Sequence, residues 1–190
     1  MNPIYEKIWK LAEEYYKKGR KMDIAHILWM MKDAEKVCKE ENIDDSLLIP
    51  LVILHDVGYS KVPKENPYNL DLRKAHMKAG AKIARGILDK LKYPKDKIKK
   101  IVYYVSVHDN WALEGYDIYK KDIILGAFND LDFMWMATPQ GFPAMMKLLN
   151  KNKEEILKHI TKADKIKTGF YTKTTEKLYN SYIDKIKKSA

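Results

Sequence analysis

Residues 47–56 read Leu-Leu-Ile-Pro-Leu-Val-Ile-Leu-His-Asp, an unbroken apolar run that ends in two polar side chains. A helix made of this run is apolar on all sides, so we expect it in the centre of a core. Burying His55 and Asp56 at its end needs a reason, because buried polar groups must be paired or hydrogen-bonded. An imidazole beside a carboxylate meets that need when both bind one divalent cation.

The rest of the chain has helical rather than alternating periodicity, and no β-branched run is bracketed by hairpin turn signals. We therefore predict an all-α fold, a single helical bundle with additional C-terminal helices. Asn2, Asp23 and Asp122 stand at positions for N-caps, and Gly19 stands where the first helix should end. The expected helices cover about residues 3–18, 24–41, 45–56, 71–91, 95–108, 123–137, 143–149, 153–166 and 174–188.

Two segments are predicted to be irregular. Residues 59–70 contain two prolines among mostly polar residues, and a loop of this kind beside a metal site would be a natural substrate lid. Residues 110–119 form the second irregular segment.

Composition indicates one soluble domain spanning residues 1–190, with 46% hydrophobic and 33% charged residues. No apolar stretch is long enough to cross a bilayer, and the start lacks a signal-peptide layout, so we expect a cytoplasmic protein without a membrane partner. The single cysteine, Cys38, excludes an intramolecular disulfide and a thiolate metal site. Any metal must then be held by nitrogen and oxygen.

The formal charge of +10 attracts anionic partners such as nucleotides at long range. The basic residues are scattered, however, and no nucleic-acid-binding signature accompanies them, so nucleic acid is not expected as a partner. The lysine-rich, glycine-poor composition is typical of a heat-adapted organism. The oligomeric state is left open.

Three further histidines lie at buried edges of predicted helices. His26 flanks the apolar stripe of its helix, whereas His76 and His108 continue the stripes of theirs. Together with His55 they are hard to explain as separate coincidences, because each buried ring must satisfy its nitrogens. His159, on a lysine-rich late helix, is expected at the surface.

Asp130 and Asp132 interrupt an otherwise largely apolar helix, where a carboxylate is costly unless it is paired or metal-bound. Residues two apart on a helix point about 200 degrees apart, so we do not expect both to bind the same ion. The other one should orient a histidine or cap a neighbouring helix.

The ordered pattern His26, His55-Asp56, Asp132 resembles the HD-domain family of metal-dependent phosphohydrolases. Residues 51–58 resemble the family's apolar-His-Asp-apolar-Gly segment, and residues 76–81 resemble its His-x-x-x-Gly-Ala helix. Asp132 is preferred over Asp130 because the family's last ligand commonly follows a small or apolar residue. The resemblance spans about residues 20–140, and about residues 141–190 would form a C-terminal helical extension.

The resemblance implies one or two divalent ions (Mn, Fe, Co, Ni, Zn or Mg) and the direct ligands His26, His55, Asp56 and Asp132. His76 and His108 would bind a second ion or contact the phosphate. The catalytic residues implied are Asp56, His76, His108 and Asp109, where Asp109 would orient a histidine or take a proton. The candidate phosphate contacts are Lys61, Lys64, Arg73 and Lys78.

The function implied is hydrolysis of a nucleotide or another small phosphoester by a metal-activated water. A non-catalytic nucleotide sensor, a two-iron oxygenase and a plain helical domain with satisfied core histidines are the alternatives. His108 followed by Gly115-Tyr116 also resembles the HD-GYP cyclic-dinucleotide phosphodiesterases. The chain departs from them at Tyr59, Val107 and Asp117, so this is a minor alternative. Trp111, Tyr116 and Tyr59 are candidates for stacking on a base.

Overall fold

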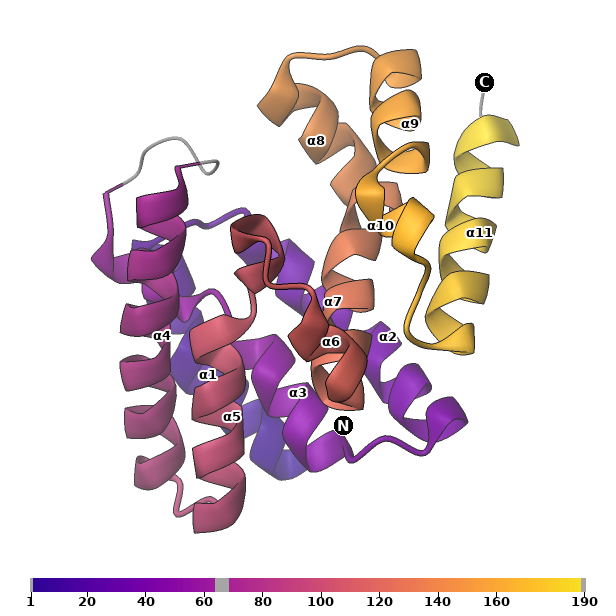
Figure 1. Cartoon of the computed structure of the whole chain (residues 1–190). Coiled ribbons are helices and arrows are strands. Elements are labelled where there is room, and N and C mark those ends of the chain that lie inside the picture. Colours follow the sequence, from indigo (N-terminus) through magenta and orange to yellow (C-terminus); the bar gives the residue numbers. More distant parts are fainter. Residues whose placement is uncertain (1, 64–68, 189–190) are drawn as a thin grey trace.

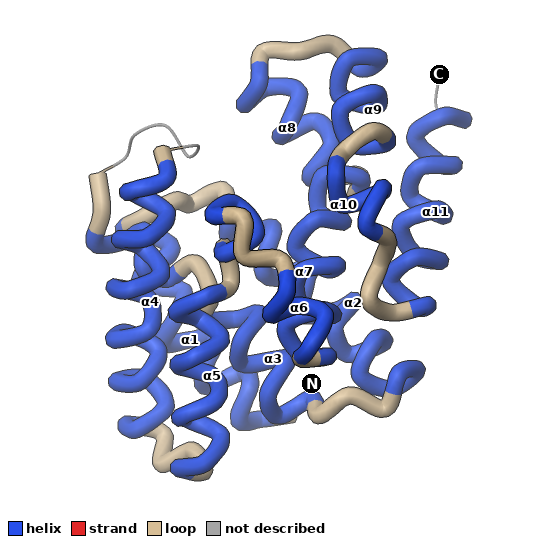
Figure 2. Tube along the Cα trace, in the orientation of Figure 1, coloured by secondary structure: helices blue, strands red, loops and turns tan. Residues whose placement is uncertain are grey.

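The computed structural model describes residues 2–63 and 69–188, and every regular element in these residues is helical (Figure 2). The prediction of an all-α fold is therefore confirmed. The α-helices are α1 (Pro3–Lys18), α2 (Asp23–Glu41), α3 (Asp45–Leu54), α4 (Leu70–Lys90), α5 (Lys95–Val107), α6 (Asp117–Lys121), α7 (Ile123–Met134), α8 (Gly141–Leu149), α9 (Lys153–Thr161), α10 (Asp164–Thr168) and α11 (Lys173–Lys188). Three 3-10 helices join them, namely η1 (Val57–Lys61), η2 (Asn110–Leu113) and η3 (Trp135–Ala137).

Helix α3 is the centre of the bundle, as its sequence predicts. Every residue from Leu47 to Leu54 is buried, and α1, α2, α5 and α7 all pack against it (Figure 1). Pro50 inside this helix has no N–H to offer the carbonyl of Ser46, four residues earlier. The hydroxyl of Tyr93 donates to that carbonyl instead, at 2.8 Å, so the partly buried acceptor stays satisfied.

The caps of α1 and α7 form as predicted. The side chain of Asn2 accepts a hydrogen bond from Ile4 N, and that of Asp122 accepts from Ile124 N and Leu125 N. Gly19 ends α1.

The prediction for Asp23 is wrong. It is the first residue of α2 rather than its N-cap, and its buried carboxylate pairs with Arg20 instead of capping the helix.

Tertiary packing gives helical structure to two segments predicted to be irregular. In the predicted loop over residues 59–70, the first three residues belong to η1 (Val57–Lys61), in which Val57 and Tyr59 are buried. Residues 64–68, which include Lys64, lie outside the described residues. Residues 110–119 contain η2 and the start of α6, in which the buried Tyr119 donates to the carbonyl of His108 at 2.8 Å. The helix expected over 153–166 is divided into α9 and α10.

The last four helices gather at one end of α7, away from α4 and α5, and α11 packs on both α2 and α7 (Figure 1). One cluster of buried apolar side chains runs from Tyr5 in α1 to Ile186 in α11. No helix in the described part of the chain has the length and the apolar character needed to cross a membrane.

The backbone approach at Gly58 sets the distance between η1 and α4. A Cβ atom added at Gly58 would lie 1.9 Å from His76 O and 2.6 Å from Gly80 N. Only a residue without a side chain lets α4 come this close to the turn that follows Asp56. Gly58 therefore brings His76 to the end of α3.

We predict that Gly58→Ala lowers the free energy of unfolding by about 1–3 kcal/mol, because α4 must move away from η1. The matched control is Gly86→Ala on the exposed face of α4, where an added Cβ meets no atom within 4 Å. That change should raise the free energy of unfolding by about 0.5–1 kcal/mol. Urea unfolding measures both, and equal effects of the two substitutions would contradict the close approach.

Candidate metal centre

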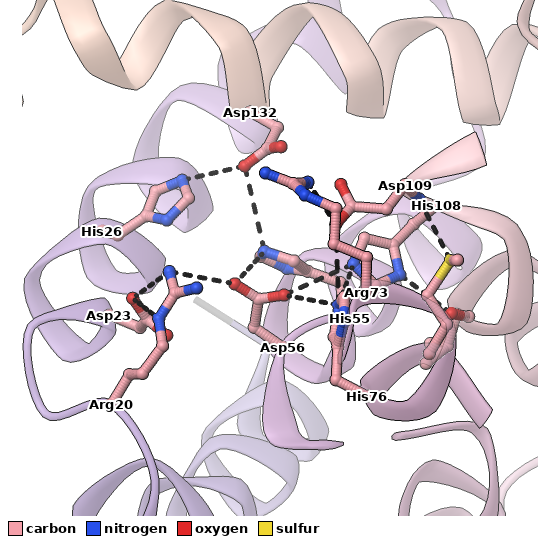
Figure 3. A network of polar contacts seen from close by, with 12 residues as sticks. Arg20, Asp23, His26, His55, Asp56, Arg73, His76, His108, Asp109 and Asp132 are labelled. Atoms are coloured by element: carbon pink, nitrogen blue, oxygen red, sulfur yellow. Dashed lines mark hydrogen bonds and ion pairs between the residues drawn. The ribbon is translucent and has the colours of Figure 1, made fainter. Parts of the chain in front are cut away.

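Helix α3 ends at Leu54, and the two residues that follow it, His55 and Asp56, lie close to residues of α2 and α7 (Figure 3). His26 Nε2, from α2, lies 3.2 Å from Asp132 Oδ1, from α7. His55 Nε2 lies 3.9 Å from the same Asp132 oxygen and 3.5 Å from Asp56 Oδ2. We call His26, His55, Asp132 and Asp56 Oδ2 the His26 cluster.

A second group forms on the other oxygen of Asp56. His76 Nε2, from α4, and His108 Nε2, at the end of α5, each lie 3.3 Å from Asp56 Oδ1. The two nitrogens are 3.2 Å apart. We call Asp56 Oδ1, His76 and His108 the His76 cluster, in which all three residues are buried.

The opposite ring nitrogens of three histidines face backbone carbonyls. His55 Nδ1 lies 2.9 Å from Val52 O, and His108 Nδ1 lies 2.8 Å from Val105 O. His76 Nδ1 is 3.4 Å from its own helix, at Leu72 O. A carbonyl only accepts, so each Nδ1 carries a proton, and Nε2 is the nitrogen of each ring that can bind a ligand.

The surroundings of these Nε2 atoms indicate whether a cation fits between them. The two Nε2 atoms of the His76 cluster face each other at 3.2 Å, an arrangement that repels unless positive charge lies between them. In the His26 cluster, His26 Nε2 and His55 Nε2 are buried and make no hydrogen bond within the described residues. Both clusters therefore place imidazole nitrogens beside carboxylate oxygens, and in the His26 cluster two of these nitrogens have no hydrogen-bond partner among the described residues.

The spacing of the donors also fits. With bonds of about 2.0–2.2 Å, two donors on one ion are separated by about 3.0 Å at right angles and about 3.4 Å at tetrahedral angles. The edges of the His76 cluster, at 3.2–3.3 Å, fall within that interval. The His76 cluster can therefore hold a divalent cation through nitrogen and oxygen. In the His26 cluster the distance between His26 Nε2 and Asp132 Oδ1, 3.2 Å, also falls within the interval, whereas the two distances from His55 Nε2, 3.5 and 3.9 Å, are longer.

The charges inside the site are strongly coupled. Burial alone would raise the pKa of Asp56, but His55, His108 and His76 hold it well below its usual range. Burial lowers the pKa of His55, yet the adjacent Asp56 outweighs this and raises it to about 9. Burial raises the pKa of Asp132, but His26 and His55 hold it below its ordinary value. A cation bound here would replace a proton on His55.

The structure separates Asp130 from Asp132. Asp130 is fully buried on the opposite side of α7, where Lys165 Nζ lies 2.5 Å from its Oδ1. Its Oδ2 accepts hydrogen bonds at the start of α11 from Tyr171 N (2.9 Å), Thr172 N (3.0 Å) and Thr175 Oγ1 (2.6 Å). Of the two alternatives predicted for one of these aspartates, orienting a histidine or capping a neighbouring helix, the contacts of Asp130 resemble the second, because they lie at the start of α11. Asp132 is the one of the two that lies beside His26 and His55.

Asp109 lies at the edge of the His76 cluster, and both of its oxygens are engaged. Oδ2 pairs with Arg73 Nη1 at 2.6 Å, and Oδ1 accepts from Trp111 Nε1 at 3.1 Å. The distance from Oδ2 to His76 Nε2 is 3.7 Å, too long for a hydrogen bond. The arginine also lies over the Trp111 ring, 4.9 Å from its centroid.

The other predicted substrate contacts lie farther out. Lys61 and Lys78 are exposed, and Lys78 follows His76 by two residues on α4, so it points about 200 degrees away from it. Tyr59 is buried and stacks on His76 with ring centroids 4.0 Å apart, so this face is closed to a base. Tyr116 is exposed, and His159 is exposed on α9, as expected.

Sequence reasoning missed Arg20 and the position of Asp23 beside the site. Arg20 Nη2 lies 2.8 Å from Asp23 Oδ1 and 3.8 Å from Asp56 Oδ2. Burial raises the pKa of Asp23 to about 6, against the lowering effect of Arg20. The signal that could have revealed Arg20 is its rarity, because only three of the 36 basic residues are arginines.

A comparison with models of protein families finds one match, described as HD domain, over residues 23–169. The matched range contains every residue of the two clusters, and it continues past residue 140, where the resemblance visible in the sequence ended. No curated protein and no solved structure matches the chain.

We predict opposite phenotypes for the two aspartates of α7. Asp130→Ala should lower the free energy of unfolding by about 3–5 kcal/mol, because it leaves Lys165 buried without its partner. Asp132→Ala should lower the affinity for Mn²⁺ and change the stability of the metal-free protein much less. Urea unfolding and metal titration measure the two effects. If Asp130→Ala lost metal affinity at unchanged stability, the assignment would be reversed.

Proposed function

This chain belongs to the HD-domain family, and we propose that it is a metal-dependent phosphohydrolase acting on a nucleotide or another small phosphoester. Proteins of this family are generally metal-dependent hydrolases. The observation that carries the proposal is that the two oxygens of Asp56 join two buried groups of histidine nitrogens. Such an arrangement has no evident use in a helical scaffold whose histidines merely fill the core.

Each cluster would hold one ion. His26, His55 and Asp132 would bind the first, together with Asp56 Oδ2, which lies 3.5 Å from His55 Nε2. Asp56 Oδ1, His76 and His108 would bind the second. When bound, such ions generate a hydroxide from water near neutral pH and neutralise charge on a phosphoryl oxygen. The helices hold the imidazoles in place through Nδ1, so the nitrogens that face the substrate region do not need to reorganise.

We assign Asp109 to positioning rather than to proton transfer. Both of its oxygens are already bonded to Arg73 and Trp111, and His76 Nδ1 is directed at its own helix rather than at Asp109. Its role is then to fix the guanidinium of Arg73 beside the His76 cluster. Arg73 is the best placed of the phosphate contacts expected from the sequence, since Lys61 and Lys78 are exposed.

We predict a two-ion stoichiometry that single substitutions divide. The metal-loaded protein should contain about two equivalents of Mn²⁺. His26→Ala and His76→Ala should each retain about one, because each removes a ligand of one cluster only. Asp56→Ala should retain neither, because Asp56 contributes an oxygen to both clusters.

Elemental analysis after removal of free metal measures these values, and circular dichroism checks the fold. His159→Ala, at an exposed position on α9, is the control and should bind as much metal as the unchanged chain. Equal metal content in the His26→Ala, His76→Ala and Asp56→Ala variants would contradict the shared carboxylate.

We predict that the apoprotein, reloaded with Mn, Co, Ni or Mg, releases phosphate from at least one member of a nucleotide panel. His55→Ala should abolish this turnover, because it removes a donor from the His26 cluster, while helical circular dichroism stays largely intact. Product analysis identifies which phosphoester bond is cleaved. Metal binding and nucleotide binding without product would support a sensor, and absence of both metal and turnover would support a plain helical scaffold.

A further inference from the structure

Arginine is rare in this chain and concentrated at the site. Only Arg20, Arg73 and Arg85 occur among 36 basic residues, so lysine is the usual cation of its surface. Arg85 is exposed on α4, whereas Arg20 and Arg73 each pair with a buried aspartate beside the clusters. A guanidinium differs from an ammonium in its planar fork of donors, which suits bidentate recognition of phosphate.

Arg20 lies in the connection between α1 and α2 and is held there by Asp23 (Figure 3). Its Nη2 and Nε atoms donate to Asp23 Oδ1 at 2.8 and 3.2 Å. Asp23 is only 2% exposed, so this anchor is a buried carboxylate. Nη2 is also 3.8 Å from Asp56 Oδ2, the oxygen that belongs to the His26 cluster.

An aromatic ring also contacts the guanidinium of Arg20. The Cζ atom of Arg20 lies 4.1 Å from the centroid of Tyr59, whose ring stacks on His76 at 4.0 Å. Two groups so close to one ring must lie on its opposite faces, so Tyr59 separates the arginine from the histidine. Arg20 is thus held through Nε and Nη2 by Asp23, and its guanidinium carbon lies over the ring of Tyr59.

The remaining edge of the guanidinium is available. Nη1 makes no hydrogen bond to the described part of the chain, and the side chain is 31% exposed. Arg73, by comparison, is 13% exposed. Arg20 is therefore a cation held by Asp23 and Tyr59 that has N–H donors not used by the described part of the chain. It reaches solvent next to the carboxylate of Asp56.

The same place would otherwise attract another ion. Ligand atoms of Asp23, His26 and Asp56 lie within 4.8 Å of one another, and Asp23 Oδ2 has no hydrogen-bond partner among the described residues. The guanidinium, 2.8 Å from Asp23, already supplies positive charge there. A guanidinium at this position differs from a metal ion because it can also donate N–H hydrogen bonds to a ligand.

We infer that Arg20 is a substrate-binding residue that donates hydrogen bonds from Nη1 to the phosphoryl oxygens of the phosphoester. This inference rests on the proposed function, because it requires the phosphoryl group to lie beside Asp56. The competing explanation is that Arg20 only neutralises the buried Asp23 and stabilises the fold. The two explanations differ in what happens to phosphate affinity when metal binding is intact.

The test compares Arg20→Met, Arg20→Lys and the control Arg85→Met, each loaded with Mn²⁺ and titrated with inorganic phosphate by calorimetry. Arg20→Met should weaken phosphate binding by about tenfold or more, because a charge-assisted contact is lost. It should leave Mn²⁺ affinity unchanged or higher, since a positive charge 3.8 Å from Asp56 has been removed. Arg20→Lys should give an intermediate phosphate affinity, and Arg85→Met should match the unchanged chain.

Phosphate affinity within twofold of the unchanged chain in metal-loaded Arg20→Met would overturn the inference. If Arg20→Met does not fold, the pair Asp23→Asn and Arg20→Met/Asp23→Asn decides, because both variants lack the buried carboxylate and differ only at Arg20. An unchanged chain that binds no Mn²⁺ would refute the proposed function instead. If that metal-free chain still binds phosphate, and Arg20→Met weakens the binding, the role of Arg20 is supported. If the metal-free chain binds no phosphate, both the proposed function and the role of Arg20 are refuted.

Discussion

A carboxylate buried at the end of an apolar helix must find positive charge, and in this protein that constraint falls on Asp56. Its two oxygens face nitrogens of His55, His76 and His108, and Arg20 stands 3.8 Å from one of them. These partners come from different helices and connections, so the neutralisation of one side chain determines how those helices meet. Burial makes the charge of Asp56 costly, but it also strengthens the attraction between Asp56 and its partners, because little water screens their charges.

The histidines serve both the helices and the site. His55 and His108 follow the last residues of α3 and α5, where carbonyls lack partners within the helix. Their Nδ1 atoms satisfy Val52 O and Val105 O, and their Nε2 atoms are left for ligands. Each ring orientation is therefore fixed by secondary structure before any metal arrives, and helix ends become the walls of the site.

Helix α7 connects the site to the C-terminal helices. Asp132 faces the His26 cluster, while Asp130, on the opposite side, anchors Lys165 and the start of α11. The C-terminal segment thus stabilises the helix that supplies a site residue, although it contributes no residue to either cluster. This arrangement gives two nearby aspartates different purposes, one in stability and one in chemistry.

The sequence by itself determined the all-α class, the central place of residues 47–54, and the set of histidines and aspartates that meet, because helical periodicity and buried polar residues are local signals. Only the tertiary structure decided the rest. The division into two clusters that share Asp56 depends on ångström-scale packing at Gly58, and the position of Arg20 depends on the turn between α1 and α2. The sequence suggests Asp23 as a helix cap, but its carboxylate pairs with Arg20. That pairing depends on side-chain geometry, which the spacing of residues in the chain does not record.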